Sequence, residues 1–205
     1  DGYIEDPLHG YNGNKDLIEY LETMFEPDEF VSYVTEVYEA PNGRFSPKQG
    51  VYYRTAKELI ESLKRSPDIT DTIGTYSEDA GAWIRFNPVD GQGIKNDNVT
   101  RFRYALVESD VISISEQDSI YRNLKLPIEF LINSGGKSLH ALVKVDAKNK
   151  DEYRERVDFL YNYLKKKGYS MLLTCSKNSK EKEAECVNDL LARNVAGIII
   201  ADSDS

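Results

Sequence analysis

The spacing of hydrophobic residues in the first third of the chain predicts a helix, a hairpin and a second helix. Residues 15–25 place apolar side chains three and four positions apart, which is typical of an amphipathic helix. Residues 30–39 alternate apolar and polar positions, and Asn42-Gly43 follows, which predicts a β-hairpin. Thr55, with Glu58 three positions later, forms a capping box that starts the next helix. These segments indicate an α/β unit.

The second half of the chain predicts a regular succession of strands and helices. In order, these are strand Tyr104–Glu108, helix Ser115–Leu124, strands Ile128–Asn133 and Leu139–Val145, helix Lys150–Lys167 and strand Ser170–Thr174. This β-α-β-β-α-β order is that of the ferredoxin-like plan, so we expect an α+β fold. In that plan the end of the first strand meets the start of the third at the centre of the sheet. We therefore expect Glu108, Asp110 and His140 to converge.

Two acidic residues at the end of the first of these strands are candidate metal ligands. Glu108 and Asp110 are two positions apart, so a strand points both side chains to the same face. Two carboxylates in one small volume repel each other, and the usual reasons to hold them there are a divalent cation or acid-base chemistry. The alternative is a strand end followed by a solvated turn, because acidic residues are mostly exposed.

A glycine-rich loop between the second and third strands is a candidate phosphate-binding segment. Its glycines let the backbone approach a ligand and present N–H groups to an anion, and its lysine adds positive charge. The loop is not a P-loop, because Leu131 stands where that motif needs a glycine and no helix follows. An ordinary hairpin turn is the alternative. The candidate nucleotide-binding residues here are Ser134, Gly135, Gly136, Lys137, Ser138 and His140.

Arginines near the acidic corner are further candidates for holding phosphates. Arg85 follows a short predicted strand, and Arg103 leads into the strand that ends at Glu108. Arg101 and Arg103 share a face if that strand begins early enough. The alternative is that these arginines face solvent.

The composition excludes some classes of protein and site. The chain has 205 residues, 40% of them hydrophobic, and a formal net charge of −9. Eleven of its 35 acidic residues and one of its 26 basic residues lie in the first 40 positions, so the remainder is nearly neutral and can still bind a nucleic acid strand. No apolar run approaches the ~20 residues that span a bilayer, so no membrane partner is expected. Two cysteines and two histidines argue against a zinc or histidine-rich site and favour the cytoplasm.

Three segments occur in the order and at the spacing of a known family. They are Gly-Ala-Trp-Ile-Arg-Phe-Asn-Pro at 81–88, Asn-Val-Thr-Arg-Phe-Arg-Tyr-Ala-Leu-Val-Glu-Ser-Asp at 98–110, and Leu-Pro-Ile through Ser-Gly-Gly-Lys-Ser-Leu-His-Ala at 126–141. About residues 15–168 resemble the primase domain of phage and mobile-element replication proteins, in the archaeo-eukaryotic primase, or primase-polymerase, superfamily. The resemblance implies an RRM-like catalytic core in residues 101–175, backed by an N-terminal α/β support unit in residues 1–100.

The resemblance also implies roles for the candidate residues. Glu108 and Asp110 match the family's first motif, whose two acids bind the catalytic Mg²⁺ or Mn²⁺. Ser138 and His140 match its second motif, whose histidine contacts the phosphates of the incoming nucleotide. The implied activity is template-directed nucleotidyl transfer, in which two metal ions polarise the α-phosphate, activate the 3′-hydroxyl and stabilise pyrophosphate. The implied partners are nucleoside triphosphates, a single-stranded DNA template and a replicative helicase domain.

The family's third motif, an acidic residue at the start of the fourth strand, is missing. That strand is expected beside the same corner, and its matching position, near Leu172, carries no carboxylate. Losing one carboxylate weakens a two-metal site. Two hypotheses follow. One is an active DNA primase-polymerase that takes a third acid from elsewhere, such as Asp202 or Asp204; the other is a catalytically impaired nucleotide- or single-strand-binding remnant or chimera.

The end of the chain resembles a different family. Residues 168–175, 181–185 and 190–200 look like the β-α-β segment of effector domains in LacI-type repressors. The resemblance covers about 37 residues, which is too few to form the effector-binding site of such a domain. We interpret residues 169–205 as a β-α-β tail joined by fusion, with chance similarity of a generic β-α-β unit as the alternative.

Overall fold

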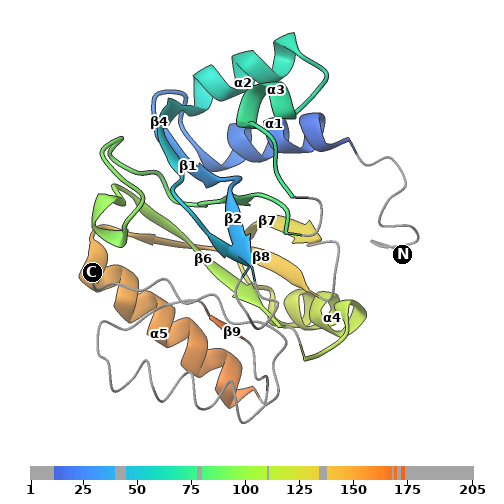
Figure 1. The fold of residues 1–205 in the computed structure, drawn as a ribbon. Helices are drawn as coiled ribbons and strands as arrows, with labels where there is room; N and C mark the ends of the chain where they lie inside the picture. Colours follow the sequence, from blue (N-terminus) through green and yellow to red (C-terminus); the bar gives the residue numbers. More distant parts are fainter. Residues whose placement is uncertain are drawn as a thin grey trace. The chain divides into compact units, whose positions relative to one another are not determined.

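The computed structural model describes residues 12–39, 45–77, 80–109, 111–133 and 138–167, together with Tyr169 and the backbone of Leu172 and Leu173 (Figure 1). The chain divides into two units, Asp1–Arg101 and Phe102–Ser205. Both combine helices with small antiparallel sheets, so the expected α+β class is confirmed. No helix among the described residues is long and apolar enough to cross a membrane.

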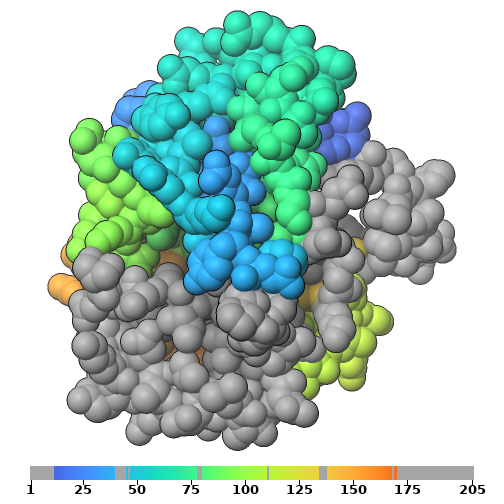
Figure 2. Space-filling view, in the orientation of Figure 1, coloured from blue at the N-terminus to red at the C-terminus, as the bar shows by residue number. Residues whose placement is uncertain are grey.

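The described part of the first unit contains two long helices, two short helical turns and two small sheets. Its three-stranded sheet has the order β4-β1-β5, and β2 and β3 form a separate antiparallel pair. Figure 2 shows the residues of α2 and α3 side by side on one face of this unit. The elements are α1 Gly13–Met24, β1 Phe30–Val34, β2 Val37–Glu39, β3 Phe45–Pro47, β4 Val51–Thr55, α2 Ala56–Arg65, α3 Thr70–Ile73, β5 Trp83–Ile84 and the 3₁₀ helix η1 Asn96–Asn98.

Local sequence signals begin both long helices of this unit, and their apolar stripes are buried. The Asn12 side chain accepts a hydrogen bond from the backbone N–H of Lys15 and so caps α1. Thr55 and Glu58 form the predicted capping box at the start of α2. Helices α1 and α2 contact each other. The side chains that they and β1 bury almost completely are Leu21, Met24, Leu59, Leu63 and Val31.

The segment predicted as one strand over residues 30–39 forms two strands. Thr35 and Glu36 separate β1, which joins the three-stranded sheet, from β2, which pairs only with β3. Two consecutive polar residues stand at this break, but the local pattern does not show that the two strands join different sheets. The predicted pairing of a hairpin is confirmed by β2 and β3, whereas its expected Asn42-Gly43 turn lies outside the described residues.

Among its described residues, the second unit has one four-stranded sheet and two long helices. The strand order is β7-β8-β6-β9, and all neighbouring strands are antiparallel. The first and third strands of this unit, β6 and β8, are therefore central, as predicted. The elements are β6 Phe102–Glu108, α4 Ile114–Leu124, β7 Ile128–Asn133, β8 Leu139–Ala147, α5 Lys150–Lys166 and β9 Leu172–Leu173.

The two faces of this sheet carry different side chains. One face forms a continuous apolar core with α4 and α5; its buried members are Ala105, Val107, Ile120, Tyr121, Leu139, Ala141, Val143, Val145, Val157, Leu160 and Leu164. Successive side chains of a strand point to opposite faces. Glu108, which follows Val107, and His140, which precedes Ala141, therefore point to the face away from both helices.

Details of this unit differ from the sequence prediction. Arg101 is exposed and precedes β6, and a register shift between Phe102 and Tyr104 interrupts the alternation. The condition for Arg101 and Arg103 to share a strand face is therefore not met. Strand β8 runs two residues further than predicted, and Asp146 near its end has a φ of +46°, in the left-handed region. Residues 174–205, including most of the proposed tail, lie outside the description.

Candidate metal and nucleotide site

The end of β6 and the start of β8 bring a carboxylate and an imidazole together. Val107 pairs with Ala141 in the β6–β8 ladder, which places Glu108 beside His140. The His140 Nε2 lies 2.6 Å from Glu108 Oε2. Their side chains are 31% and 13% exposed. The predicted convergence of these two residues is thus confirmed, whereas Asp110, the third residue expected there, lies outside the described residues.

The Glu108 carboxylate is held through one of its two oxygens. Besides His140, the Ser138 hydroxyl donates to the same Oε2 at 3.5 Å. Ser138 is only 2% exposed, so its hydroxyl faces the carboxylate from inside the protein. No hydrogen bond to Glu108 Oε1 is present among the described residues. This second oxygen can therefore coordinate a cation without breaking the contact with His140.

Behind this corner, α4 contributes two buried polar side chains that the sequence analysis missed. The Gln117 side chain binds backbone groups of Ser109, Ile112 and Leu139, and it is completely buried. The Tyr121 hydroxyl lies within hydrogen-bonding distance of the Val107 and Leu139 carbonyl oxygens. Burial, and to a lesser extent the negative charge of Glu108, raise the pKa of Tyr121 well above its ordinary value of 10.0. Tyr121 is therefore a neutral hydrogen-bond donor.

A sequence signal for Gln117 does exist. It shares one face of α4 with Ile120, Tyr121 and Leu124, which follow it at helical spacing. A glutamine on an apolar helix face must satisfy its amide by hydrogen bonds when it is buried. Its helical position thus predicts burial, although the glutamine alone suggests an exposed residue.

On its other side, β6 pairs with β9, where the family resemblance places a third acid. Val107 pairs with Leu173 and Glu108 with Leu172. Residues directly opposite each other in an antiparallel pair share a face of the sheet. Position 172 is therefore in register with the carboxylate of Glu108, and the sequence has no acid at that position.

The other candidate nucleotide ligands lie in several parts of the chain. Arg85 belongs to the first unit, where its Nη1 donates to Asn96 Oδ1 at 3.3 Å. Arg103 lies in β6 of the second unit, and its guanidinium carbon is 5.9 Å from the centre of the Tyr104 ring. The loop formed by Ser134, Gly135, Gly136 and Lys137 lies outside the described residues. The roles of these residues stay predictions.

The residues of the corner fit a hard divalent cation that also binds a nucleotide. Mg²⁺ is commonly held by one or two carboxylates, with substrate phosphates completing its coordination. Glu108 supplies one such carboxylate, with an oxygen available. No group of three His, Cys, Asp or Glu side chains close enough to hold a metal occurs within the part of the chain that the structure describes. The described side chains alone therefore do not form a closed metal centre.

Comparison with known proteins gives no relative from which a role could be transferred. No family model, curated protein or solved structure matches this chain. Support for a function therefore comes from the geometry of the corner and from the motifs in the sequence.

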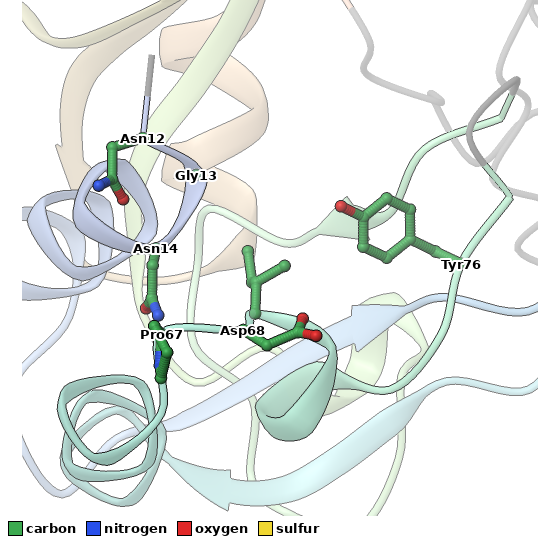
Figure 3. A pocket seen from close by; sticks show the side chains of 7 residues that line it. Asn12, Gly13, Asn14, Pro67, Asp68 and Tyr76 are labelled. Atoms are coloured by element: carbon green, nitrogen blue, oxygen red, sulfur yellow. The ribbon is translucent and has the colours of Figure 1, made fainter. Parts of the chain in front are cut away.

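A pocket in the first unit is a second candidate site, and its chemistry is less specific. It has a volume of about 450 Å³ and opens beside the first turn of α1 (Figure 3). Three of its polar side chains take part in the fold: Asn12 caps α1, the Asn14 amide donates to the Ser66 carbonyl at 2.6 Å, and the Asp68 carboxylate accepts from the backbone and hydroxyl of Thr70. The lining residues are Asn12, Gly13, Asn14, Pro67, Asp68, Ile69 and Tyr76.

Proposed function

We propose that the chain contains the catalytic domain of a DNA primase-polymerase, which joins nucleotides on a single-stranded DNA template. The observation that carries this proposal is the 2.6 Å contact of His140 with Glu108 on the helix-free face of the sheet. The β-α-β-β-α-β element order, with β6 and β8 central, further supports an RRM-like arrangement of this unit. The two motifs that resemble the primase family meet at this corner through Glu108 and His140.

In this proposal each side chain of the corner has a distinct task. Glu108 and Asp110 bind Mg²⁺ or Mn²⁺, with Glu108 using the oxygen that does not contact His140. His140 is oriented by Glu108 and contacts the nucleotide phosphates. Lys137 and the glycines beside it add positive charge and N–H donors at the same phosphates. Ser138 orients the Glu108 carboxylate from the buried side.

The reaction is a displacement at the α-phosphorus of a nucleoside triphosphate. The 3′-oxygen of the growing strand forms a bond to this phosphorus, the bond to the bridging oxygen of the β-phosphate breaks, and pyrophosphate leaves. A bound divalent metal neutralises the charge that develops on the transferring group. The protein contributes mainly position and charge, so small displacements of its ligands reduce the rate strongly.

The direct test is primer synthesis on single-stranded DNA with nucleoside triphosphates and Mn²⁺. We expect product from the wild-type chain and at least about a hundredfold less from Asp110→Ala and His140→Ala. Asp151→Ala is the matched control, since it removes a carboxylate from an 88% exposed side chain at the start of α5. Equal synthesis by wild type and Asp110→Ala would remove the catalytic proposal.

The second candidate function is a catalytically impaired nucleotide- or single-strand-binding domain. The observation that favours it is the register of Leu172 with Glu108, because this is the position at which the family resemblance expects a third carboxylate. Under this hypothesis nucleotide binding depends on Mn²⁺ and Glu108, but the wild-type chain makes no product. Leu172→Asp is the discriminating variant, with Leu172→Asn as its uncharged control. Synthesis that appears only in Leu172→Asp would support impairment by loss of this acid, and equal synthesis in all three chains would contradict it.

A further inference from the structure

We propose that Gln117 and Tyr121 form a buried clamp on α4 that positions Glu108 relative to His140. Both side chains lie on the helix-covered face of the sheet, opposite Glu108 and His140, so the clamp acts through the backbone. The clamp acts on the Glu108–His140 contact. Its consequence for catalysis rests on the proposed function, and the experiment below separates the two.

Gln117 joins the start of β8 to the segment that follows β6. Its side-chain Nε2 donates to the carbonyl oxygens of Ser109 at 2.8 Å and Ile112 at 2.9 Å. Its Oε1 accepts from the backbone N–H of Leu139 at 3.0 Å. Ser109 and Ile112 flank position 110 in the sequence, so the same amide fixes the backbone on both sides of the second predicted metal ligand.

Tyr121 contacts both central strands through its hydroxyl group. Its hydroxyl lies 3.1 Å from the Val107 carbonyl oxygen and 2.9 Å from that of Leu139. These carbonyls belong to the residues directly before Glu108 and His140. The two carbonyl oxygens, one from each strand, thus share the single proton of this hydroxyl. Tyr121 follows Gln117 by four positions, which places both side chains on the same face of α4.

The hydrogen bonds of the clamp involve residues directly next to Glu108 and His140. Glu108 lies between the held carbonyls of Val107 and Ser109, and His140 directly follows Leu139, which is held at both its N–H and its carbonyl. A shift of either strand changes the separation of the two backbones, and the short contact between the side chains leaves little room for such a shift. The clamp therefore has a positioning role in addition to stabilising the fold.

A matched pair of tyrosine variants separates positioning from general stability. Tyr121→Phe removes a hydroxyl that binds the end of β6 next to Glu108. Tyr153→Phe removes a hydroxyl that donates to the carbonyl of Tyr104 at 3.0 Å, in the same strand but away from the corner. A third variant, Gln117→Met, keeps the side-chain length without the amide. If circular dichroism shows that Gln117→Met does not fold, Gln117→Glu is used in its place, because it keeps the acceptor for the Leu139 N–H.

The readout is the ¹⁵N chemical shift of the His140 ring nitrogens in the full chain without ligands. The chain has only two histidines, so loss of signal in His140→Gln assigns them. Glu108→Gln gives the shift of the imidazole next to an uncharged partner. We expect Tyr121→Phe and Gln117→Met to move the His140 signals toward this reference, and Tyr153→Phe to leave them at the wild-type position.

Identical His140 signals in wild type, Tyr121→Phe and the Gln117 variant would overturn the clamp. In primer synthesis we expect the clamp variants to lower kcat about tenfold, with KM within about twofold of wild type, and Tyr153→Phe to leave both within about twofold. If the His140 signals move but no chain makes primers, the clamp stands and the proposed function fails. If all chains make primers equally although the signals move, the clamp is present but does not govern catalysis, which contradicts its proposed role.

Discussion

The contact between Glu108 and His140 can be measured as a coupling free energy. In a double-mutant cycle, Glu108→Ala, His140→Ala and the double variant are compared with the wild-type chain. The 2.6 Å separation is that of a hydrogen bond to a charged group, which contributes about 1.5–3 kcal/mol when shielded from water. Side-chain exposures of 13% and 31% let water screen part of this energy. We therefore expect a coupling of about 1–2 kcal/mol in favour of the folded state.

The assay is urea unfolding at pH 7, followed by circular dichroism, for all four chains of the cycle. Asp118 and Arg122 provide the control cycle, because their side chains meet at 2.8 Å in the same unit and the pair is more exposed, at 24% and 54%. For this pair we expect about 0.3–0.5 kcal/mol. A Glu108–His140 coupling no larger than that of the control would refute the argument that partial burial strengthens the contact at the corner.

Three further predictions concern the framework around the site. Leu164 is 1% exposed in the core of the second unit, so we expect Leu164→Ala to lower the free energy of unfolding by about 2–5 kcal/mol. A decrease below about 1 kcal/mol in urea unfolding would contradict its packing in the core. Gly50→Ala places a Cβ 2.8 Å from a β1 carbonyl oxygen, so we expect a lower Tm by thermal unfolding, and an unchanged Tm would contradict this crowding. Hydrogen bonds from the Ser113 hydroxyl and N–H lower the pKa of Glu116 below 4.5. The ionised Glu116 therefore stabilises the folded state above pH 4.5, and this stabilisation is lost as the pH falls through the lowered pKa. Glu116→Gln should therefore flatten the acid dependence of stability between pH 6 and pH 3, and an unchanged slope would contradict it.

Local signals in the sequence predicted helix starts and the central strand pair correctly. The predicted capping box of Thr55 with Glu58 is present, because it depends only on residues three positions apart. The order of elements then fixed which strands are neighbours. The meeting of Glu108 with His140 follows from this topology together with the period of the strands.

Features that depend on several chain segments at once were not predictable in the same way. The break between β1 and β2 lies at the polar pair Thr35 and Glu36, but which sheet each strand joins depends on its partners β4, β5 and β3 elsewhere in the chain. The register shift near Phe102 depends on its partner strand β8. The burial of Gln117 depends on backbone groups of Ser109 and Leu139, which meet only after the sheet and α4 have packed.

The most direct test of the central claim is paramagnetic broadening of the His140 ring signals by Mn²⁺ in the presence of a nucleoside triphosphate. We expect substoichiometric Mn²⁺ to broaden these signals in the wild-type chain and Glu108→Gln to reduce the broadening. Sharp His140 signals in a wild-type chain that binds both Mn²⁺ and the nucleotide would place the metal elsewhere and contradict the account.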